Sequence, residues 1–276
     1  MQTLNNKWSS GVSLLRTYFG DTNLASGTCF FWRHEGQTFL VTNWHNLTGR
    51  NHLTGENLSP NGGRPDHVEV WVYRKVDIPL PPGTPATKFA TRYEPLRIKI
   101  CEPDHTGIRW FHHPVFGSKV DIGVLDVTDN IQGLSLKAVN DLEDDAVMNL
   151  EVSQDVFVLG FPFGQMNGLP APVWKRGTLA SDPSFDIDYL PKVLIDTATR
   201  EGMSGSPVVA RNMIFGDYKK KDGAVQDAIV GRIDTVLGIY SGRHYPDLER
   251  AQLGIVWKRS AIEETIAAMQ VAVLSP

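Results

Sequence analysis

The stretch REGMSGSPVV, residues 200–209, places Ser204 in a glycine-flanked turn directly before a short apolar run. Two other stretches also set a polar residue beside a strand-like run, namely LVTNWHN with His45 and VDIGVLDV with Asp121. A serine hydroxyl becomes a strong nucleophile only when a base takes its proton, and imidazole suits that task. A buried carboxylate would hold the imidazole in the required tautomer and stabilise its cation. The pattern therefore predicts Ser204 as nucleophile, His45 as base and Asp121 as orienting carboxylate.

The glycines around Ser204 indicate how developing negative charge is stabilised. A turn of the form G-x-S-G can aim the backbone N–H groups of Gly202 and Ser204 at one point. Such donors form an oxyanion hole, and the loss of one typically costs about 3–4 kcal/mol of barrier. Ser206 is a rival nucleophile two residues further on, but no G-x pair precedes it. We therefore expect Gly202 and Ser204 to form the hole and Ser204 to attack.

The order of the three residues along the chain discriminates between known solutions of this chemistry. The α/β-hydrolases run Ser, Asp, His and the subtilisins run Asp, His, Ser, whereas the chymotrypsin-like order is His, Asp, Ser. The order here is His45, Asp121, Ser204. It therefore favours the chymotrypsin-like arrangement, which is built from strands.

Short apolar runs bounded by turn residues dominate the chain. Most have 4–8 residues and are rich in Val, Ile, Phe and Tyr, which is typical of strands. They are Val12–Phe19, Thr28–Trp32, Thr38–Thr42, Val68–Tyr73, Leu96–Ile100, Ile122–Val127, Val156–Phe161, Val193–Thr197, Pro207–Ala210, Ile229–Tyr240 and Gly254–Trp257. We expect Gly231 and Gly238 to break the run at 229–240, and the Pro-rich segment 77–90 to be an extended loop. Many short strands with frequent turns predict an all-β fold.

Composition divides the chain into two halves of similar length. The stretch 131–150 is more acidic and less strand-like than its surroundings, and we interpret it as a linker. Residues 1–130 would then form one β-domain that carries the base and the carboxylate. Residues 151–258 would form a second, which carries the nucleophile.

The last segment, residues 259–276, is predicted to be an amphipathic helix that packs on the strands. Ser260 and Glu263 have the spacing of an N-terminal capping box. The apolar residues that recur at helical intervals are Ile262, Ile266, Met269 and Val273.

The overall composition excludes several classes of protein. The chain has 276 residues, of which 41% are hydrophobic, and a net charge of -4. A domain that binds nucleic acid through bulk charge is usually basic, so we expect no nucleic-acid partner. No apolar run approaches the ~20 residues that span a bilayer, so we expect no membrane association.

The N-terminus and the cysteines bear on the cellular compartment. The first twenty residues lack an apolar core and a small-residue cleavage site, which predicts no signal peptide. Only two cysteines are present, Cys29 and Cys101, so a disulfide scaffold is excluded. We expect both to be plain buried thiols, and we interpret the protein as cytoplasmic.

One cluster of potential metal ligands stands before Asp121. Cys101, His105, His112 and His113 lie within a short stretch. Their spacing does not follow the paired pattern of zinc ligands, so we predict a polar loop and no metal or other cofactor. A run of three lysines at 219–221 is expected at a solvated hairpin tip.

Six short motifs occur in an order that one known family shares. They are SGTCFFW at 26–32, TNWHN at 42–46, DIGVL at 121–125, VLGFPFG at 158–164, GMSGSP at 202–207 and LGIYSG at 237–242. Through them, from about Gly11 to Arg259, the chain resembles the chymotrypsin-like (trypsin-type) serine peptidases, in the bacterial, disulfide-free branch related to HtrA-type proteases. For example, GMSGSP is similar to the family's G-[DN]-S-G-G-P, and DIGVL to its D-I-A-L-L.

The resemblance implies two antiparallel six-stranded β-barrels of chymotrypsin-like fold, with the active site in the cleft between them. It implies a polypeptide substrate that binds as an extended strand along Ser241, Gly242 and Arg243. It also implies that Ala198 forms the base of the specificity pocket, with Thr199 beside it. No carboxylate stands at Ala198, so we expect a small to medium apolar residue before the cleaved bond.

Two departures from the family pattern affect regulation. Met203 stands where secreted relatives have an Asp that pairs with a new N-terminus after zymogen cleavage. Met cannot form that ion pair, so we expect any control to come from loop ordering or from an activating protein or domain. Asn46 stands where secreted relatives have a Cys, which agrees with a reducing compartment. The expected function is therefore a serine endopeptidase acting through an acyl-enzyme, with a non-catalytic peptide-binding scaffold or adaptor as the alternative.

Overall fold

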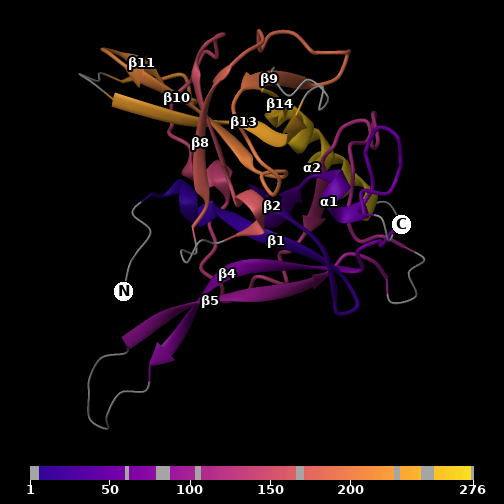
Figure 1. Cartoon of the computed structure of the whole chain (residues 1–276). Coiled ribbons are helices and arrows are strands. Elements are labelled where there is room, and N and C mark those ends of the chain that lie inside the picture. The colour runs from indigo at the N-terminus through magenta and orange to yellow at the C-terminus, as the bar shows by residue number, and fades with distance from the viewer. Residues whose placement is uncertain are drawn as a thin grey trace, which may run out of the picture.

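The computed structural model describes residues 6–59, 62–78, 88–102, 107–165, 171–226, 231–243 and 252–274. Two β units lie one above the other, and a C-terminal helix runs alongside both (Figure 1). The fold is therefore mostly β with one long helix, as the sequence predicts. Short 3-10 helices occur at Trp8–Gly11 (η1), Val139–Leu142 (η2) and Pro162–Gly164 (η3).

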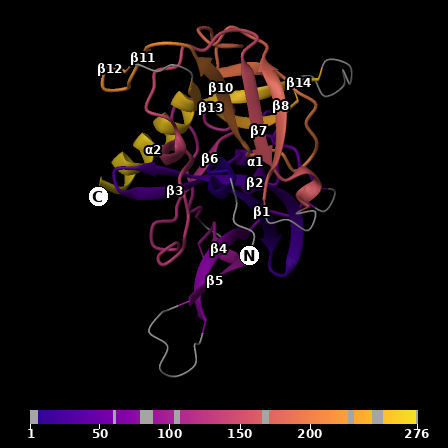
Figure 2. The same ribbon diagram turned by 90° about the vertical axis from the view of Figure 1, so that its left-hand side faces the viewer.

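The first half of the chain forms an antiparallel sheet. Its strands are β1 (Val12–Phe19), β2 (Thr22–His34), β3 (Gln37–Thr42), β4 (His67–Ile78), β5 (Lys88–Lys99) and β6 (Gly123–Asp126). They are ordered β5-β4-β1-β2-β3-β6. The β4–β5 hairpin extends well beyond the body of the molecule (Figure 2). A short helix, α1 (Trp44–Thr48), follows β3 and carries His45.

The second half forms a closed antiparallel barrel ordered β10-β13-β14-β9-β8-β7. Its strands are β7 (Asp155–Gly160), β8 (Val173–Leu179), β9 (Lys192–Asp196), β10 (Pro207–Ile214), β13 (Gly231–Arg243) and β14 (Leu253–Lys258). A small hairpin of β11 (Tyr218–Lys219) and β12 (Val225–Gln226) carries the lysine run. Lys221 in this hairpin pairs with Glu143 at 2.9 Å, so its tip is not wholly solvated.

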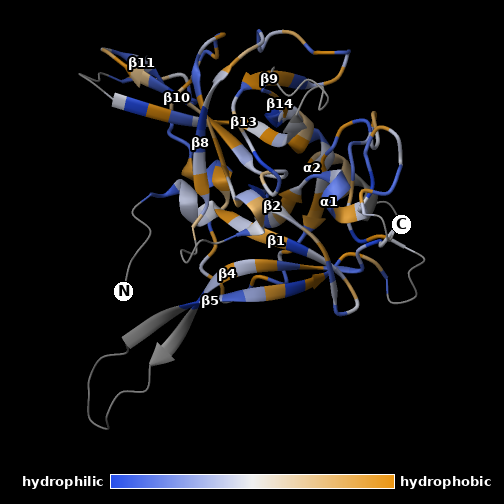
Figure 3. Cartoon of the chain, in the orientation of Figure 1, coloured by the Kyte–Doolittle hydropathy of each residue, from blue (hydrophilic) through white to orange (hydrophobic). Residues whose placement is uncertain are grey.

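Two local predictions are wrong, and one strand was missed. The ends of the predicted loop 77–90 belong to β4 and β5, while residues 79–87 lie outside the described part. Gly238 does not break β13, because a bulge beside it absorbs the irregularity, whereas the residues before Gly231 lie outside the described part. Strand β8 was not predicted, because its residues are mostly half-exposed and show no apolar run. Along β4 and β5, by contrast with β8, polar and apolar residues alternate clearly (Figure 3).

Helix α2 (Arg259–Leu274) buries the face that its sequence predicts. Ile262, Ile266 and Met269 are buried, and the helix contacts β13, β14 and β6. The predicted capping box is wrong, because the helix already begins at Arg259 and Glu263 pairs with the Arg259 guanidinium at 2.7 Å instead. The side chain of Val273 lies outside the described residues.

One hydrophobic cluster joins the two halves and α2. It contains Trp8 and Phe30 from the first half, Val209 and Trp257 from the second, and Ile266 from the helix. Full burial of such a side chain stabilises by about 1.5–3 kcal/mol relative to exposure. The two halves therefore share a core, which fixes the position of His45 and Asp121 relative to Ser204.

Candidate active site

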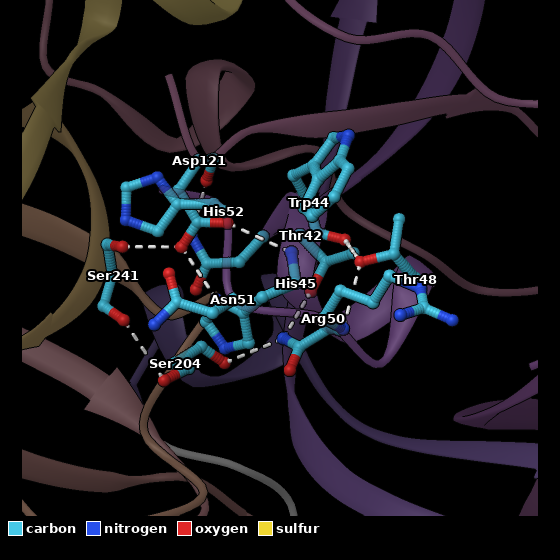
Figure 4. Close-up of polar contacts among 12 residues, drawn as sticks. Thr42, Trp44, His45, Thr48, Arg50, Asn51, His52, Asp121, Ser204 and Ser241 are labelled. Carbon is cyan, nitrogen blue, oxygen red and sulfur yellow. Dashed lines mark hydrogen bonds and ion pairs between the residues drawn. The ribbon is translucent and has the colours of Figure 1, made fainter. Parts of the chain in front are cut away.

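Helix α1 orients His45 toward Asp121. The His45 backbone N–H donates to Asp121 Oδ1 at 2.9 Å, and His45 Nδ1 lies 2.6 Å from Asp121 Oδ2 (Figure 4). The Asp121 side chain is fully buried, whereas 18% of the His45 side chain is exposed. This contact places the proton of a neutral imidazole on Nδ1 and leaves Nε2 able to accept a proton from the cleft.

The environment of Asp121 keeps its carboxyl ionised. Burial alone would raise its pKa, but the charge and hydrogen bond of His45 outweigh this effect. His52 adds a favourable charge, and the Ser241 hydroxyl donates to Oδ2 at 2.5 Å. The pKa of Asp121 is consequently held below its usual value.

A β-bulge brings Ser241 into the site. In the β13–β14 ladder Tyr240 pairs with Val256 and Gly242 pairs with Ile255, so Ser241 is the bulged residue and faces no residue of β14. Its hydroxyl reaches Asp121, and its carbonyl accepts a hydrogen bond from Ser204 Oγ at 3.2 Å. Bulges commonly re-aim residues beside active sites in this way. Among the described residues, Ser204 Oγ makes no hydrogen bond to His45, which is the contact that proton transfer requires.

The turn before Ser204 contains the two backbone N–H groups that the sequence predicts as oxyanion donors. The Glu201 carbonyl accepts a hydrogen bond from the Phe163 N–H at 2.7 Å. A trans peptide points the N–H of the next residue the opposite way, so Gly202 N–H faces away from Phe163. Within the described chain, neither Gly202 N–H nor Ser204 N–H has a protein acceptor. Both remain available to an oxyanion.

Only glycine fits at position 202. Gly202 has φ +85°, and a Cβ there would lie 2.4 Å from the Phe161 carbonyl oxygen. The glycine thus allows the turn to pack closely on η3.

Two side chains that the sequence did not single out for this role support the turn from behind. Thr28 Oγ1 donates to the Gly202 carbonyl at 2.8 Å, and Thr28 N–H donates to the Ser204 carbonyl at 2.8 Å. Asn46 Nδ2 donates to the same Ser204 carbonyl at 3.3 Å. No pattern in the sequence indicated these contacts, because they join segments far apart along the chain.

Ser206 cannot act as the rival nucleophile in this arrangement. Its side chain is fully buried inside the barrel, and its Oγ occupies the space that a Cβ of Gly160 would need. Ser204, by contrast, is partly exposed. The turn therefore leaves Ser204 partly exposed and directs Ser206 into the core.

Of the residues predicted to bind substrate, Ser241 contacts Ser204, and Thr199 contacts the large buried side chain of Tyr240. Thr199 is buried, and its hydroxyl is hydrogen-bonded to the hydroxyl of Tyr240. A Cβ on Gly254 would lie 2.6 Å from the Tyr240 ring. Ala198 stays partly exposed beside them. Gly242 and Arg243 end β13, and the Arg243 side chain lies outside the described residues.

The potential metal ligands do not converge in the part of the chain that the structure describes. No group of three His, Cys, Asp or Glu side chains there could hold a metal ion. His113 is buried, donates from Nε2 to Glu264 of α2 at 3.0 Å, and has its pKa lowered by burial. His105 lies outside the described residues.

The two cysteines differ in burial. Cys29 is fully buried, and burial raises the pKa of its thiol. Cys101 is only partly buried, so the expectation that both are buried is wrong for Cys101.

A β-barrel packed on a second antiparallel sheet, with a His–Asp pair facing a serine turn, defines the class of chymotrypsin-like serine peptidases. A model of the trypsin-like peptidase domain matches residues 27–213. The chain therefore belongs to the trypsin-like peptidase family and is a serine protease of that type.

Solved structures resemble this chain in fold at low sequence identity. An inactive form of the Rv3671c protease from M. tuberculosis H37Rv is 15% identical, with 99% of this chain and 93% of that chain covered and a TM-score of 0.51. The serine endoprotease from Yersinia pestis is 10% identical, with 97% and 68% covered and a TM-score of 0.48. No curated protein matches the sequence significantly. In the described part of the chain, no helix is long and apolar enough to cross a membrane.

Proposed function

We propose that the protein is a serine endopeptidase that hydrolyses peptide bonds through an acyl-enzyme, with His45, Asp121 and Ser204 as its triad. The observation that carries the proposal is the pair of N–H groups at Gly202 and Ser204 that have no acceptor among the described residues, beside a partly exposed hydroxyl and an oriented imidazole. A scaffold that only binds peptides has no need of donors held at the position of an oxyanion.

In the proposed reaction Ser204 Oγ attacks the peptide carbonyl while His45 Nε2 takes its proton. The negative charge that forms on the carbonyl oxygen accepts hydrogen bonds from the Gly202 and Ser204 N–H groups. His45 then gives the proton to the leaving amine, and the peptide bond breaks. Water deacylates the ester at Ser204 with His45 again as base. Asp121 stays ionised throughout and stabilises the imidazolium.

The contact between Ser204 Oγ and the Ser241 carbonyl suggests a resting state that substrate releases. A peptide that adds as a strand along Ser241, Gly242 and Arg243 would offer an N–H to the Ser241 carbonyl. Ser204 would lose its acceptor there and turn toward His45. Substrate, or an activating protein or domain that orders this edge, would thereby complete the triad.

Specificity is proposed to favour small residues before the cleaved bond. The Tyr240 ring lies against Gly254 and its hydroxyl bonds to Thr199, so it fills the space that a larger side chain would enter. A reducing, cytoplasmic location is also proposed, because the sequence holds only two cysteines.

Hydrolysis of a quenched-fluorescent peptide library tests the proposal. We expect cleavage by the wild type and by Ser206→Ala, but none by Ser204→Ala. Ser206→Ala is the matched control because it removes a hydroxyl two residues away in the same turn. Cleavage by Ser204→Ala would refute the proposal. Peptide binding by the wild type without cleavage, at any pH and with candidate activators present, would instead support the scaffold.

A further inference from the structure

A mainly apolar cavity lies beside α1 and is lined by Trp44, Leu47 and Thr48 of that helix. Its volume is about 540 Å³, within the range of small-molecule sites. Its inner wall consists of Leu47, Ile100 and Trp110, which are nearly fully buried. Trp44 packs edge-on against Trp110, with ring centroids 6.4 Å apart, and in Figure 4 it points away from Ser204 and Ser241. The cavity is therefore not part of the site described above.

Two arginines at this cavity have unused hydrogen-bonding capacity. Arg50 and Arg64 both line it. The Arg50 Nε–H is buried and has no hydrogen-bond partner among the residues that the structure describes, while the Arg50 Nη1 donates to Gly55 and Asn57. Arg64 is exposed and makes no ion pair with a described residue. No carboxylate in the described chain forms an ion pair with either guanidinium, and no Asp or Glu lines the cavity.

An apolar wall beside unpaired guanidinium groups fits one chemistry. We propose that this cavity binds a single-chain anionic amphiphile, such as a fatty acid, with its tail against Trp44, Leu47 and Trp110 and its acidic head on Arg50 and Arg64. A buried N–H without a partner is costly, and a carboxylate or phosphate oxygen would satisfy it. The tail would replace water at the inner wall. Such a ligand would contact the helix that carries His45.

Binding of laurate below its micelle concentration tests this site in the full chain. Calorimetry gives the affinity, and intrinsic tryptophan fluorescence should change because Trp44 and Trp110 line the cavity. We expect laurate to bind at least tenfold more tightly than dodecanol, which has the tail without the charge, and acetate not to bind measurably. Equal affinity for laurate and dodecanol would overturn the proposed role of the arginines.

A charge-reversal pair on the rim locates the site. Ile108 lines the cavity and is 57% exposed, so its substitution should leave the fold intact. Ile108→Glu should weaken laurate binding about tenfold by repelling the head, whereas Ile108→Lys, equally polar, should retain it. Arg64→Gln should also weaken it, and Arg176→Gln, which alters a remote exposed arginine, should not. Unchanged affinity in both Ile108→Glu and Arg64→Gln would overturn the site.

Vesicles distinguish a free amphiphile from a lipid in a bilayer. The cavity is sized for a single chain, so we expect laurate to bind while phosphatidylglycerol vesicles do not compete for it. Binding to vesicles that Ile108→Glu abolishes, without binding of free laurate, would show a membrane-docking surface instead and contradict the proposal.

Discussion

At the scale of single residues, buried contacts hold the turn that carries Ser204. Met203 is fully buried in the core of the barrel and anchors the turn by packing. Thr28 holds the carbonyl of Gly202 through its hydroxyl. Phe163 holds the carbonyl of Glu201 and thereby sets the direction of the Gly202 N–H. The turn is therefore held without an ion pair to a new N-terminus.

Thr28→Val should reduce activity although Thr28 touches no substrate. Valine keeps the shape but removes the hydrogen bond to the Gly202 carbonyl and the acceptor for the Phe161 N–H. We expect kcat to fall roughly tenfold or more with little change in KM, since removal of a whole oxyanion donor costs about 10²–10³. Thr28→Ser, which retains the hydroxyl, should restore kcat. Equal steady-state kinetics for the valine and serine variants would contradict this role.

Asp121→Asn should lower kcat much further than Thr28→Val does. An amide beside His45 Nδ1 can favour the wrong imidazole tautomer, and comparable changes in this chemistry lower kcat by about 10⁴. In the wild type the pKa of Asp121 is held below its usual value, so the stabilisation from the His45–Asp121 contact is lost as pH falls. The variant has no carboxylate at this position, so its stability should lack this pH-dependent contribution. Steady-state kinetics and thermal unfolding between pH 3 and 7 check both expectations. Activity near that of the wild type would refute the assignment of Asp121.

At the scale of elements, strand β13 places some of its residues in the core and others at the candidate active site. The bulge at Ser241 turns its hydroxyl and carbonyl to the site, while Tyr240 stays inside the barrel and is 2% exposed. One strand therefore contacts both Asp121 and Ser204, and it carries Tyr240, which is proposed to limit the specificity pocket. Helix α1 has a similar double role, with His45 toward the cleft and Trp44 toward Trp110.

Tyr240→Val should widen the residues accepted before the cleaved bond. We expect the ratio of kcat/KM for a phenylalanine peptide over an alanine peptide to rise at least tenfold. Tyr240→Phe keeps the ring and should leave the ratio unchanged, although it removes the bond to Thr199. This ratio does not depend on the fraction of the variant that is folded. Such a readout is needed because truncation of a core residue typically lowers the free energy of unfolding by about 2–5 kcal/mol. An unchanged ratio for the valine variant would exclude Tyr240 as the limiting group.

At the scale of the whole molecule, the acidic stretch 131–150 contacts segments that lie far from it in the sequence. Glu143 is nearly fully buried; it pairs with Arg259 of α2 and Lys221, and accepts the Val236 N–H of β13. Asp144 accepts the backbone N–H of Asp234. Together with the shared core, these contacts join the barrel, the helix and the linker.

Glu143→Gln should destabilise the whole fold. Removing one partner of a buried ion pair typically costs about 3–5 kcal/mol, and the partial exposure of Arg259 places the expected loss nearer 2–3 kcal/mol. Burial alone would raise the pKa of Glu143, but the Val236 N–H and Arg259 lower it overall. Its stabilisation is thus present above the ordinary pKa of about 4.3 and is lost as pH falls further.

Urea unfolding between pH 3 and 7 measures this effect. The difference in unfolding free energy between the wild type and Glu143→Gln should be full near neutral pH and shrink in acid. Asp141→Asn is the matched control, because Asp141 pairs with Arg33 at the surface and should change stability by less than about 1 kcal/mol. A difference that grows as pH falls would contradict the assigned sign.

The sequence predicted what short motifs encode and missed what distant contacts create. Strand β1 was predicted with the bounds it has, and His45, Asp121 and Ser204 do lie around one site. Helix α1 was missed because five residues carry too little periodicity. The contacts of Thr28 depend on tertiary packing, which no local pattern records.

The most direct measurement of the central claim is labelling with a fluorophosphonate probe, followed by peptide mapping. The account predicts a single adduct on Ser204, because the probe reacts only where nucleophile, base and oxyanion donors act together. The label should be lost in Ser204→Ala, retained in Ser206→Ala and strongly slowed in Asp121→Asn. An adduct on Ser206, or equal labelling of wild type and Asp121→Asn, would contradict the account.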